Sequence, residues 1–94
     1  MKTVGAFLQR DMGYTVYILQ SERDGSYYIG QTASLEERIR RHNEGRGRYT
    51  RTKIPWRLVY REEFVTRGGA MIREKGLKAR KDRGYIEQLV RASR

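Results

Sequence analysis

The hydrophobic and polar positions first form a regular pattern at Tyr14, and this pattern predicts a β-hairpin. Residues 14–19 are an almost unbroken run of β-forming side chains, and residues 26–31 hold a second run of aromatic and β-branched residues. Asp24 and Gly25 lie between the runs and are typical turn residues. We therefore predict two strands joined by a short turn.

The next pattern is that of an amphipathic helix between Ser34 and Gly45. Leu35 and Ile39 lie four positions apart and define its inward face. Ser34 and Glu37 match a capping box, in which the serine hydroxyl and the glutamate side chain bond backbone N–H groups at the helix start. The pattern predicts a helix that starts after Ser34 and ends near Gly45.

A basic loop and a third strand are predicted next. Residues 45–53 are spaced by glycines and contain no acid, which is typical of a loop. The basic side chains of this loop are Arg46, Arg48, Arg51 and Lys53. Residues 56–64 alternate at Trp56, Leu58 and Tyr60 and predict a strand.

Two further helices complete the pattern. One is expected over about residues 68–80, started by Thr66, and the last begins at about Asp82. The last helix buries Tyr85, Ile86, Leu89 and Val90 at helical spacing. Residues 1–13 have no clear period and are interpreted as a leader of unassigned role, so the domain is expected over residues 14–94.

The amino-acid composition indicates which kind of molecule the protein binds, but not which reaction it catalyses. The 94 residues suit one domain, with 37% hydrophobic and 34% charged residues. Lysine and arginine number 21 against 11 acids, a formal charge of +10, which favours a polyanion, and nucleic acid is the leading candidate. A solvated basic surface, ribosomes and anionic lipid are the alternatives that charge alone leaves open.

Cysteine is absent, so the chain has neither a disulfide framework nor a thiolate metal site, which is compatible with a cytoplasmic protein. The apolar run at residues 4–8 is too short for a signal-peptide core or a membrane span. Export and membrane insertion are not indicated.

Three polar side chains fall beside or within the predicted apolar faces. Arg38 and His42 lie one helical turn apart beside Leu35, where both side chains can reach a shared cleft. In the alternative interpretation, the Arg38 guanidinium points to water and His42 is an ordinary helix-end residue. Glu74 lies on the inward face of its helix and needs a cation, a donor cluster or a metal. Lys78, one turn later, is the alternative partner in a plain ion pair.

Tyrosine is frequent in the hairpin, which contains four of the seven tyrosines. The predicted turn brings Tyr17 and Tyr28 within a few ladder positions of each other. These two phenols either face one cleft or serve as ordinary packing residues of the sheet.

The tripeptides at residues 15–17 and 28–30 resemble the paired motifs of GIY-YIG nucleases. Thr15 and Val16 replace the glycine and isoleucine of the first motif, while Tyr17 retains its tyrosine. The resemblance runs from Tyr14 to about Val90 and includes Leu35 to Arg38, His42-Asn43, Pro55-Trp56, and Ala70 to Lys78. It implies an α+β fold in β-β-α-β-α-α order, a three-stranded antiparallel sheet flanked by helices. The cleft would lie where the hairpin meets the first two helices.

The resemblance also implies a role for each polar residue singled out above. Glu74 would be the sole protein ligand of one divalent metal, Mg²⁺ or Mn²⁺. Arg38 would neutralise charge on the phosphate. Tyr17 would act as general base or orient the water, Tyr28 would hydrogen-bond the water or phosphate, and His42 would assist proton transfer or position Tyr17.

These roles imply a metal-dependent endonuclease that cleaves DNA, favoured over RNA, with structure-directed or weak specificity. Gly30 would permit a close approach of backbone or substrate, and Arg46, Arg48, Arg51 and Lys53 would bind nucleic acid. The alternatives are a catalytically silent basic nucleic-acid-binding module and an accessory subunit of a repair complex. Retention of all five polar site residues favours activity.

Overall fold

The computed structural model describes residues 13–80 and 82–93, and its three strands form one antiparallel sheet. The strands are β1 (Tyr14–Ser21), β2 (Tyr27–Thr32) and β3 (Trp56–Phe64), in the spatial order β2-β1-β3. The helices are α2 (Leu35–Asn43), α3 (Arg67–Arg80) and α4 (Arg83–Ala92), with a short 3₁₀ turn, η1 (Thr50–Lys53), before β3. Gly25 turns the hairpin at φ +79°. The predicted α+β architecture and element order are confirmed.

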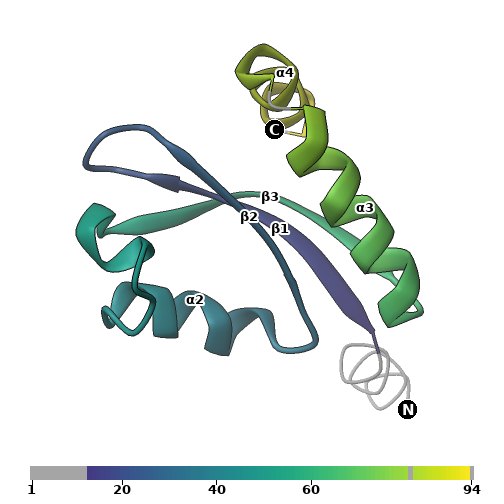
Figure 1. The fold of residues 1–94 in the computed structure, drawn as a ribbon, viewed down its shortest axis with the longest axis horizontal. Coiled ribbons are helices and arrows are strands. Elements are labelled where there is room, and N and C mark those ends of the chain that lie inside the picture. Colours follow the sequence, from purple (N-terminus) through teal and green to yellow (C-terminus); the bar gives the residue numbers. More distant parts are fainter. Residues whose placement is uncertain (1–12, 81, 94) are drawn as a thin grey trace.

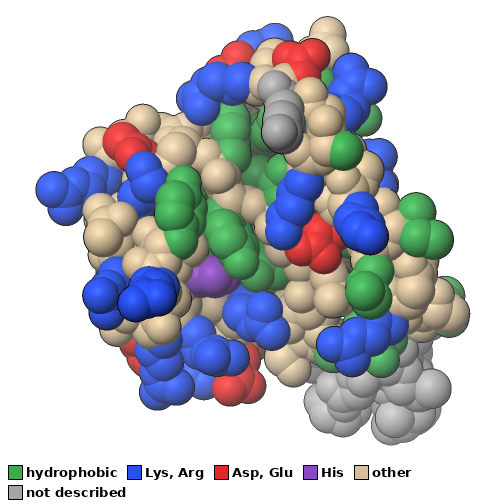
Figure 2. All heavy atoms as spheres, viewed as in Figure 1, with side chains coloured by type: hydrophobic (Ala, Val, Ile, Leu, Met, Phe, Trp, Pro, Cys, Tyr) green, Lys and Arg blue, Asp and Glu red, His purple; other side chains and the backbone are tan. Residues whose placement is uncertain are grey.

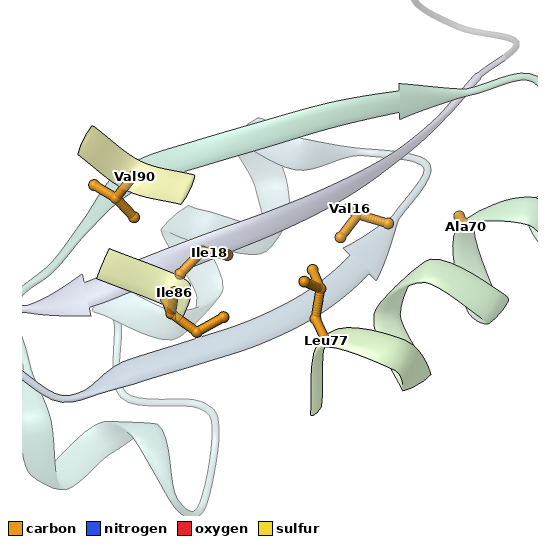
Figure 3. Packing of buried hydrophobic residues seen from close by; sticks show 6 residues of the cluster. All are labelled: Val16, Ile18, Ala70, Leu77, Ile86 and Val90. Carbon is orange, nitrogen blue, oxygen red and sulfur yellow. The ribbon is translucent and has the colours of Figure 1, made fainter. Parts of the chain in front are cut away.

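Helices cover both faces of the sheet, with α2 on one side and α3 and α4 on the other (Figure 1). The α3 and α4 face holds the larger core, formed by Val16, Ile18, Ala70, Leu77, Ile86 and Val90 (Figure 3). Tyr17, Leu19 and Trp56 are buried on the α2 face. Successive β1 side chains alternate between these cores, which explains why the apolar run of the central strand is unbroken.

A bulge in β3 changes which face its residues meet. Ile18 pairs with Tyr60 while Leu19 pairs with Leu58, so Val59 is an extra residue in β3. Leu58 packs with the α2 face and Tyr60 with the opposite one. The alternation at Trp56, Leu58 and Tyr60 correctly indicates a strand, yet these residues do not share one face.

The capping box predicted at Ser34 and Glu37 is wrong. Ser34 is the N-cap residue of α2, but its side chain makes no capping hydrogen bond. The Ser34 N–H instead donates to Thr32 Oγ1 at 3.0 Å, so the backbone donor that Glu37 would bond in a capping box is already engaged. Packing of Leu35 and Ile39 on the sheet stabilises the helix in place of the cap.

The predicted starts of the last two helices are confirmed, and the basic loop requires a correction. Thr66 Oγ1 accepts a hydrogen bond from Gly69 N–H at 3.1 Å, and Asp82 caps α4. The loop contains η1, whose first residue, Thr50, is buried.

Residues 1–12, most of the predicted leader, lie outside the described part of the chain. Within that part, no helix is both long and apolar enough to cross a membrane.

Candidate active site

Tyr17 lies at the centre of the candidate site, and its position depends on Gly30. Tyr17 pairs with Gly30 of the edge strand β2, and its side chain is fully buried on the α2 face. A Cβ atom at Gly30 would lie 2.5 Å from the Tyr17 hydroxyl oxygen. The phenol therefore crosses β2 directly over Gly30, where only glycine leaves room. In this structure the Tyr17 side chain makes the close approach at Gly30.

His42 is the buried residue of α2, and both of its ring nitrogens are engaged. Its side chain is 7% exposed. The Nε2 atom lies 3.3 Å from Tyr17 Oη, and Nδ1 lies 3.0 Å from Thr50 Oγ1. These contacts rule out an ordinary solvated helix-end histidine and place His42 between the catalytic candidate Tyr17 and the η1 turn.

Thr50 is the member of the cluster that sequence reasoning missed. It is 2% exposed, and its carbonyl accepts a hydrogen bond from Trp56 Nε1 at 2.8 Å. A Cβ atom at Gly47 would overlap Thr50 Oγ1, so Gly47 provides the space for this hydroxyl. A threonine among arginines in a loop gives no sequence signal of burial. The contact with His42 exists only because η1 folds back on α2.

Tyr28 and Trp56 form an aromatic wall beside His42. The Tyr28 ring lies edge-on to His42, with centroids 4.7 Å apart, and 6.2 Å from the Trp56 ring. Asn43 fixes this wall to α2, because its side chain donates to the Trp56 carbonyl at 3.1 Å and accepts from the Trp56 N–H at 2.7 Å. The Tyr17 and Tyr28 centroids are 6.3 Å apart, so both phenols lie on one side of the sheet.

The Tyr17 phenol and the His42 imidazole are both neutral at pH 7. Burial is the main cause that raises the pKa of Tyr17 to about 12. Tyr28 and Glu74 act in the same direction, and the charge of Arg38 opposes them. Burial, followed by neighbouring arginine charges, lowers the pKa of His42 from 6.5. The pair therefore combines a phenol that keeps its proton with an imidazole able to accept one.

Arg38 and Glu74 both act on the Tyr17 phenol although their helices cover opposite faces of the sheet. The passage of the phenol over Gly30 explains this, because it carries the hydroxyl onto the edge strand, against which α3 also packs. Figure 2 shows a hollow between the α2 side and α3, with the histidine at its base and an acidic side chain beside basic ones on the α3 side.

The ion pair considered for Glu74 is also present. Lys78 Nζ lies 2.9 Å from Glu74 Oε2, and the Glu74 side chain is 20% exposed. Lys78 thus supplies part of the compensation that an inward carboxylate needs. The ion pair does not cancel the effect of the Glu74 charge on the phenol, because this charge still contributes to raising the pKa of Tyr17.

A comparison of the chain with known families identifies the domain that carries these residues. Residues 13–86 match the model of the GIY-YIG catalytic domain. The chain belongs to the GIY-YIG family. This is a nuclease family, so the chain is a GIY-YIG nuclease domain that binds nucleic acid.

Relatives of this GIY-YIG domain include proteins of the UPF0213 group. It is 43% identical over 67 residues to one from Streptococcus pneumoniae, covering 70% of this chain and 67% of that protein. It is 43% identical over 76 residues to one from Bacillus licheniformis, covering 77% of each chain. The solution NMR structure of one from Bacillus halodurans is 40% identical, covers 86% of this chain and 85% of that chain, and has a TM-score of 0.55.

Glu74 has the chemistry of a single protein ligand for a divalent metal. Among residues 13–80 and 82–93, no three His, Cys, Asp or Glu side chains gather into a metal-binding group. Mg²⁺ commonly takes one or two carboxylates and completes its shell with water and phosphate oxygens. A single partly exposed carboxylate therefore fits such an ion, whose remaining ligands would be oxygens from outside the protein.

The basic residues of the loop differ in whether an acid pairs with them. Arg46 pairs with Glu44 at 3.4 Å, and Lys53 pairs with Asp24 at 2.7 Å. Arg48 and Arg51 are exposed, and neither has a carboxylate within 4.0 Å in the described part of the chain. The four predicted nucleic-acid-binding residues therefore divide into two paired and two free cations.

Proposed function

We propose that this GIY-YIG domain is a divalent-metal-dependent endonuclease that hydrolyses phosphodiester bonds in DNA. The observation that carries the proposal is the hydrogen-bond distance of 3.3 Å between Tyr17 Oη and the neutral imidazole of His42. Arg38 and Glu74 act on the same phenol, so the acid-base pair lies where a phosphate charge and a metal would be compensated.

Tyr17 and His42 act as a relay for one proton. As water attacks phosphorus, its proton passes to the Tyr17 oxygen while the phenolic proton passes to His42 Nε2. The relay avoids a free phenolate, which the raised pKa of about 12 disfavours. The relay requires the His42 tautomer that carries its hydrogen on Nδ1. In that tautomer Nδ1–H donates to Thr50 Oγ1, 3.0 Å away, and Nε2 is unprotonated and available.

The remaining residues stabilise the phosphate. The planar guanidinium of Arg38 stays protonated, and its N–H groups match the oxygens of a phosphate. Tyr28 donates a hydrogen bond to the water or the phosphate. Glu74 would hold Mg²⁺ or Mn²⁺, which supplies a Lewis acid at the phosphate. Loss of Glu74 is expected to abolish cleavage more completely than loss of Tyr28.

The substrate is DNA with a branched, flapped or damaged structure, cleaved with weak sequence preference in the cytoplasm, in association with a repair partner. The formal charge of +10 supports binding through phosphates, which carry no sequence information. A single domain within residues 14–94 has little surface with which to contact a long run of bases.

Cleavage of labelled DNA tests the proposal. With Mn²⁺ or Mg²⁺, purified protein should nick branched or single-stranded DNA, and Glu74→Ala or Tyr17→Phe should abolish nicking while binding persists. Glu87→Ala, which removes a carboxylate from α4, should cleave at the normal rate. Unchanged cleavage by both site variants would identify a contaminating nuclease and reject the assignment.

A catalytically silent nucleic-acid-binding module is the second candidate, and the Glu74–Lys78 ion pair favours it. In that case Lys78 occupies the carboxylate permanently. The module would bind DNA with strong salt dependence but cleave no member of a panel of DNA and RNA structures with either metal. Turnover of any member of the panel that depends on Glu74 would exclude this candidate.

A further inference from the structure

A pocket lined by basic side chains opens beside the catalytic cluster, by which we mean Tyr17, His42 and Thr50. The pocket lies between the end of β2, α2 and the start of α3. Its volume is about 390 Å³. The residues that matter here are Thr32, Ser34, Glu37, Arg38, Arg41 and Arg67. We refer to it as the arginine pocket. Arg38 belongs both to this pocket and to the surroundings of Tyr17, so the two sites adjoin.

The arginine pocket has a net positive charge, which favours binding of an anion. Three guanidinium groups, which stay protonated at all relevant pH values, line it against the single carboxylate of Glu37. Within residues 13–80 and 82–93, neither Arg38, Arg41 nor Arg67 has a carboxylate within 4.0 Å. Three converging cations repel one another, and a bound anion would remove this repulsion.

Two hydroxyl groups add neutral donors to the pocket. The Ser34 hydroxyl is not used to cap α2. Thr32 Oγ1 accepts a hydrogen bond from Ser34 N–H at 3.0 Å, which leaves its own hydrogen free to donate. A tetrahedral oxyanion with several acceptor oxygens suits this mixture of guanidinium and hydroxyl donors better than a planar carboxylate does.

The spacing of the arginines connects the pocket to the catalytic cluster. Arg38 and Arg41 are three residues apart on α2, so their Cβ atoms are about 5–6 Å apart on one helix face. This separation is comparable with one nucleotide step along a nucleic-acid strand. Arg67 comes from α3 and approaches the same pocket from another element. A strand whose scissile phosphate lies at Arg38 would therefore place its next phosphate between Arg41 and Arg67.

We propose that the arginine pocket binds the backbone phosphate adjacent to the scissile one. The proposal rests on the proposed function, because Arg38 marks the scissile position only if this domain cleaves nucleic acid. Arg41 and Arg67 clamp the neighbouring phosphate, and Ser34 donates to it. This subsite fixes the register and direction of the strand at Tyr17, which gives the enzyme a preference for a cleavage position without a preference for sequence.

Thymidine 3′,5′-bisphosphate tests the subsite without cleavage, because it carries two phosphates one nucleoside apart. In metal-free low-salt buffer, titrations followed by NMR should show it binding about tenfold more tightly than thymidine 5′-monophosphate or 3′-monophosphate, since it adds charge-assisted hydrogen bonds. Arg67→Gln should reduce its affinity to that of the monophosphates. Arg91→Gln, on α4, is the matched control and should leave the affinity unchanged.

Equal affinities for the bisphosphate and both monophosphates would overturn the proposal, as would equal losses in Arg67→Gln and Arg91→Gln. If Arg67→Gln does not give a folded amide spectrum, Arg41→Gln replaces it with the same expectation. Failure of the subsite is distinguishable from failure of the proposed function. A protein that prefers the bisphosphate but cuts no DNA has a site for two adjacent phosphates, and only the assignment of one of them as scissile fails. A protein that cuts DNA but does not prefer the bisphosphate loses the subsite alone.

Discussion

At the scale of single residues, the site depends on one hydroxyl that fixes an imidazole. His42 Nδ1 lies 3.0 Å from Thr50 Oγ1, and Nε2 lies 3.3 Å from Tyr17 Oη. The tautomer with hydrogen on Nδ1 satisfies both contacts when the Tyr17 phenol is the donor. The raised pKa of Tyr17, about 12, keeps that phenol protonated.

Thr50→Val should therefore slow cleavage by about tenfold or more, because it removes the acceptor that holds the active tautomer. Thr50→Ser keeps a hydroxyl and should retain most of the rate. Nitrogen-15 shifts of His42 report which ring nitrogen carries the proton, and only the valine variant should move the proton from Nδ1 toward Nε2. A rate loss with an unchanged tautomer would show that Thr50 is merely a packing residue.

The pH dependence follows from the neutral state of His42. Burial and nearby arginines lower its pKa, so the midpoint of protonation, which would block proton acceptance, lies below the ordinary value of 6.5. The cleavage rate should be independent of pH near 7 and fall as pH falls through this lowered pKa. The pH–rate profile at constant metal concentration measures it, and an acid limb above 6.5 would contradict the assignment of His42 as acceptor.

Gly30→Ala should disable the site through Tyr17. The added Cβ would lie 2.5 Å from the phenol oxygen, so the ring must move, at a cost of about 1–3 kcal/mol in unfolding free energy. Gly76→Ala is the control, because a Cβ there meets nothing within 4 Å and should stabilise α3 by about 0.5–1 kcal/mol. Chemical denaturation and cleavage assays measure both effects. Full activity of Gly30→Ala would refute the role of the crossing phenol.

Sequence reasoning found the residues whose signal is local and missed those defined by distant contacts. Tyr17, Arg38 and Glu74 are visible because they interrupt an apolar pattern or match a motif. Thr50 gives no such signal, because its burial arises from the fold of η1 against α2. The capping box at Ser34 failed because Thr32, two residues earlier, competes for the same backbone N–H.

At the scale of elements, features with a local sequence signal were again predicted, and features set by contacts between distant segments were not. The hydrophobic pattern predicted the three strands and the helices α2, α3 and α4, but not the 3₁₀ turn η1. The helices show a spacing of about 3.6 residues, whereas β1 is an unbroken apolar run because both of its faces are buried. The pattern did not predict that Val59 is extra in β3, because the bulge is set by pairing with β1 rather than by the β3 sequence.

The arrangement of α3 leads to a prediction about metal affinity. Lys78 competes for the Glu74 carboxylate at 2.9 Å. Lys78→Met should raise Mn²⁺ affinity by about two- to fivefold, the range expected for a partly exposed ion pair. Lys75→Met removes an equal charge from the same helix and is the control. Calorimetric titration measures both, and equal effects of the two variants would mean that only the total charge matters.

At the scale of the whole molecule, only part of the positive charge is free of ion pairs and available to contact phosphates. The formal charge is +10, yet many arginines and lysines are paired with acids, including Arg46 with Glu44 and Lys53 with Asp24. Composition predicted the total charge correctly but not this distribution, which depends on which acids the fold brings close. Paired cations contribute less to phosphate contacts, because binding must first disrupt an existing ion pair.

The salt dependence of DNA binding should reveal this distribution. If Arg48 and Arg51 each contact one phosphate, replacing both with alanine should reduce the slope of log K against log salt by about 0.9 per lost contact, equally for all sequences. The matched double variant Arg46→Ala with Lys53→Ala should reduce it less, because these side chains are engaged by Glu44 and Asp24. Fluorescence anisotropy at several salt concentrations measures the slopes. Equal slopes for the two variants would show that the loop acts as a diffuse charge, and a sequence-dependent loss would show that these arginines read bases.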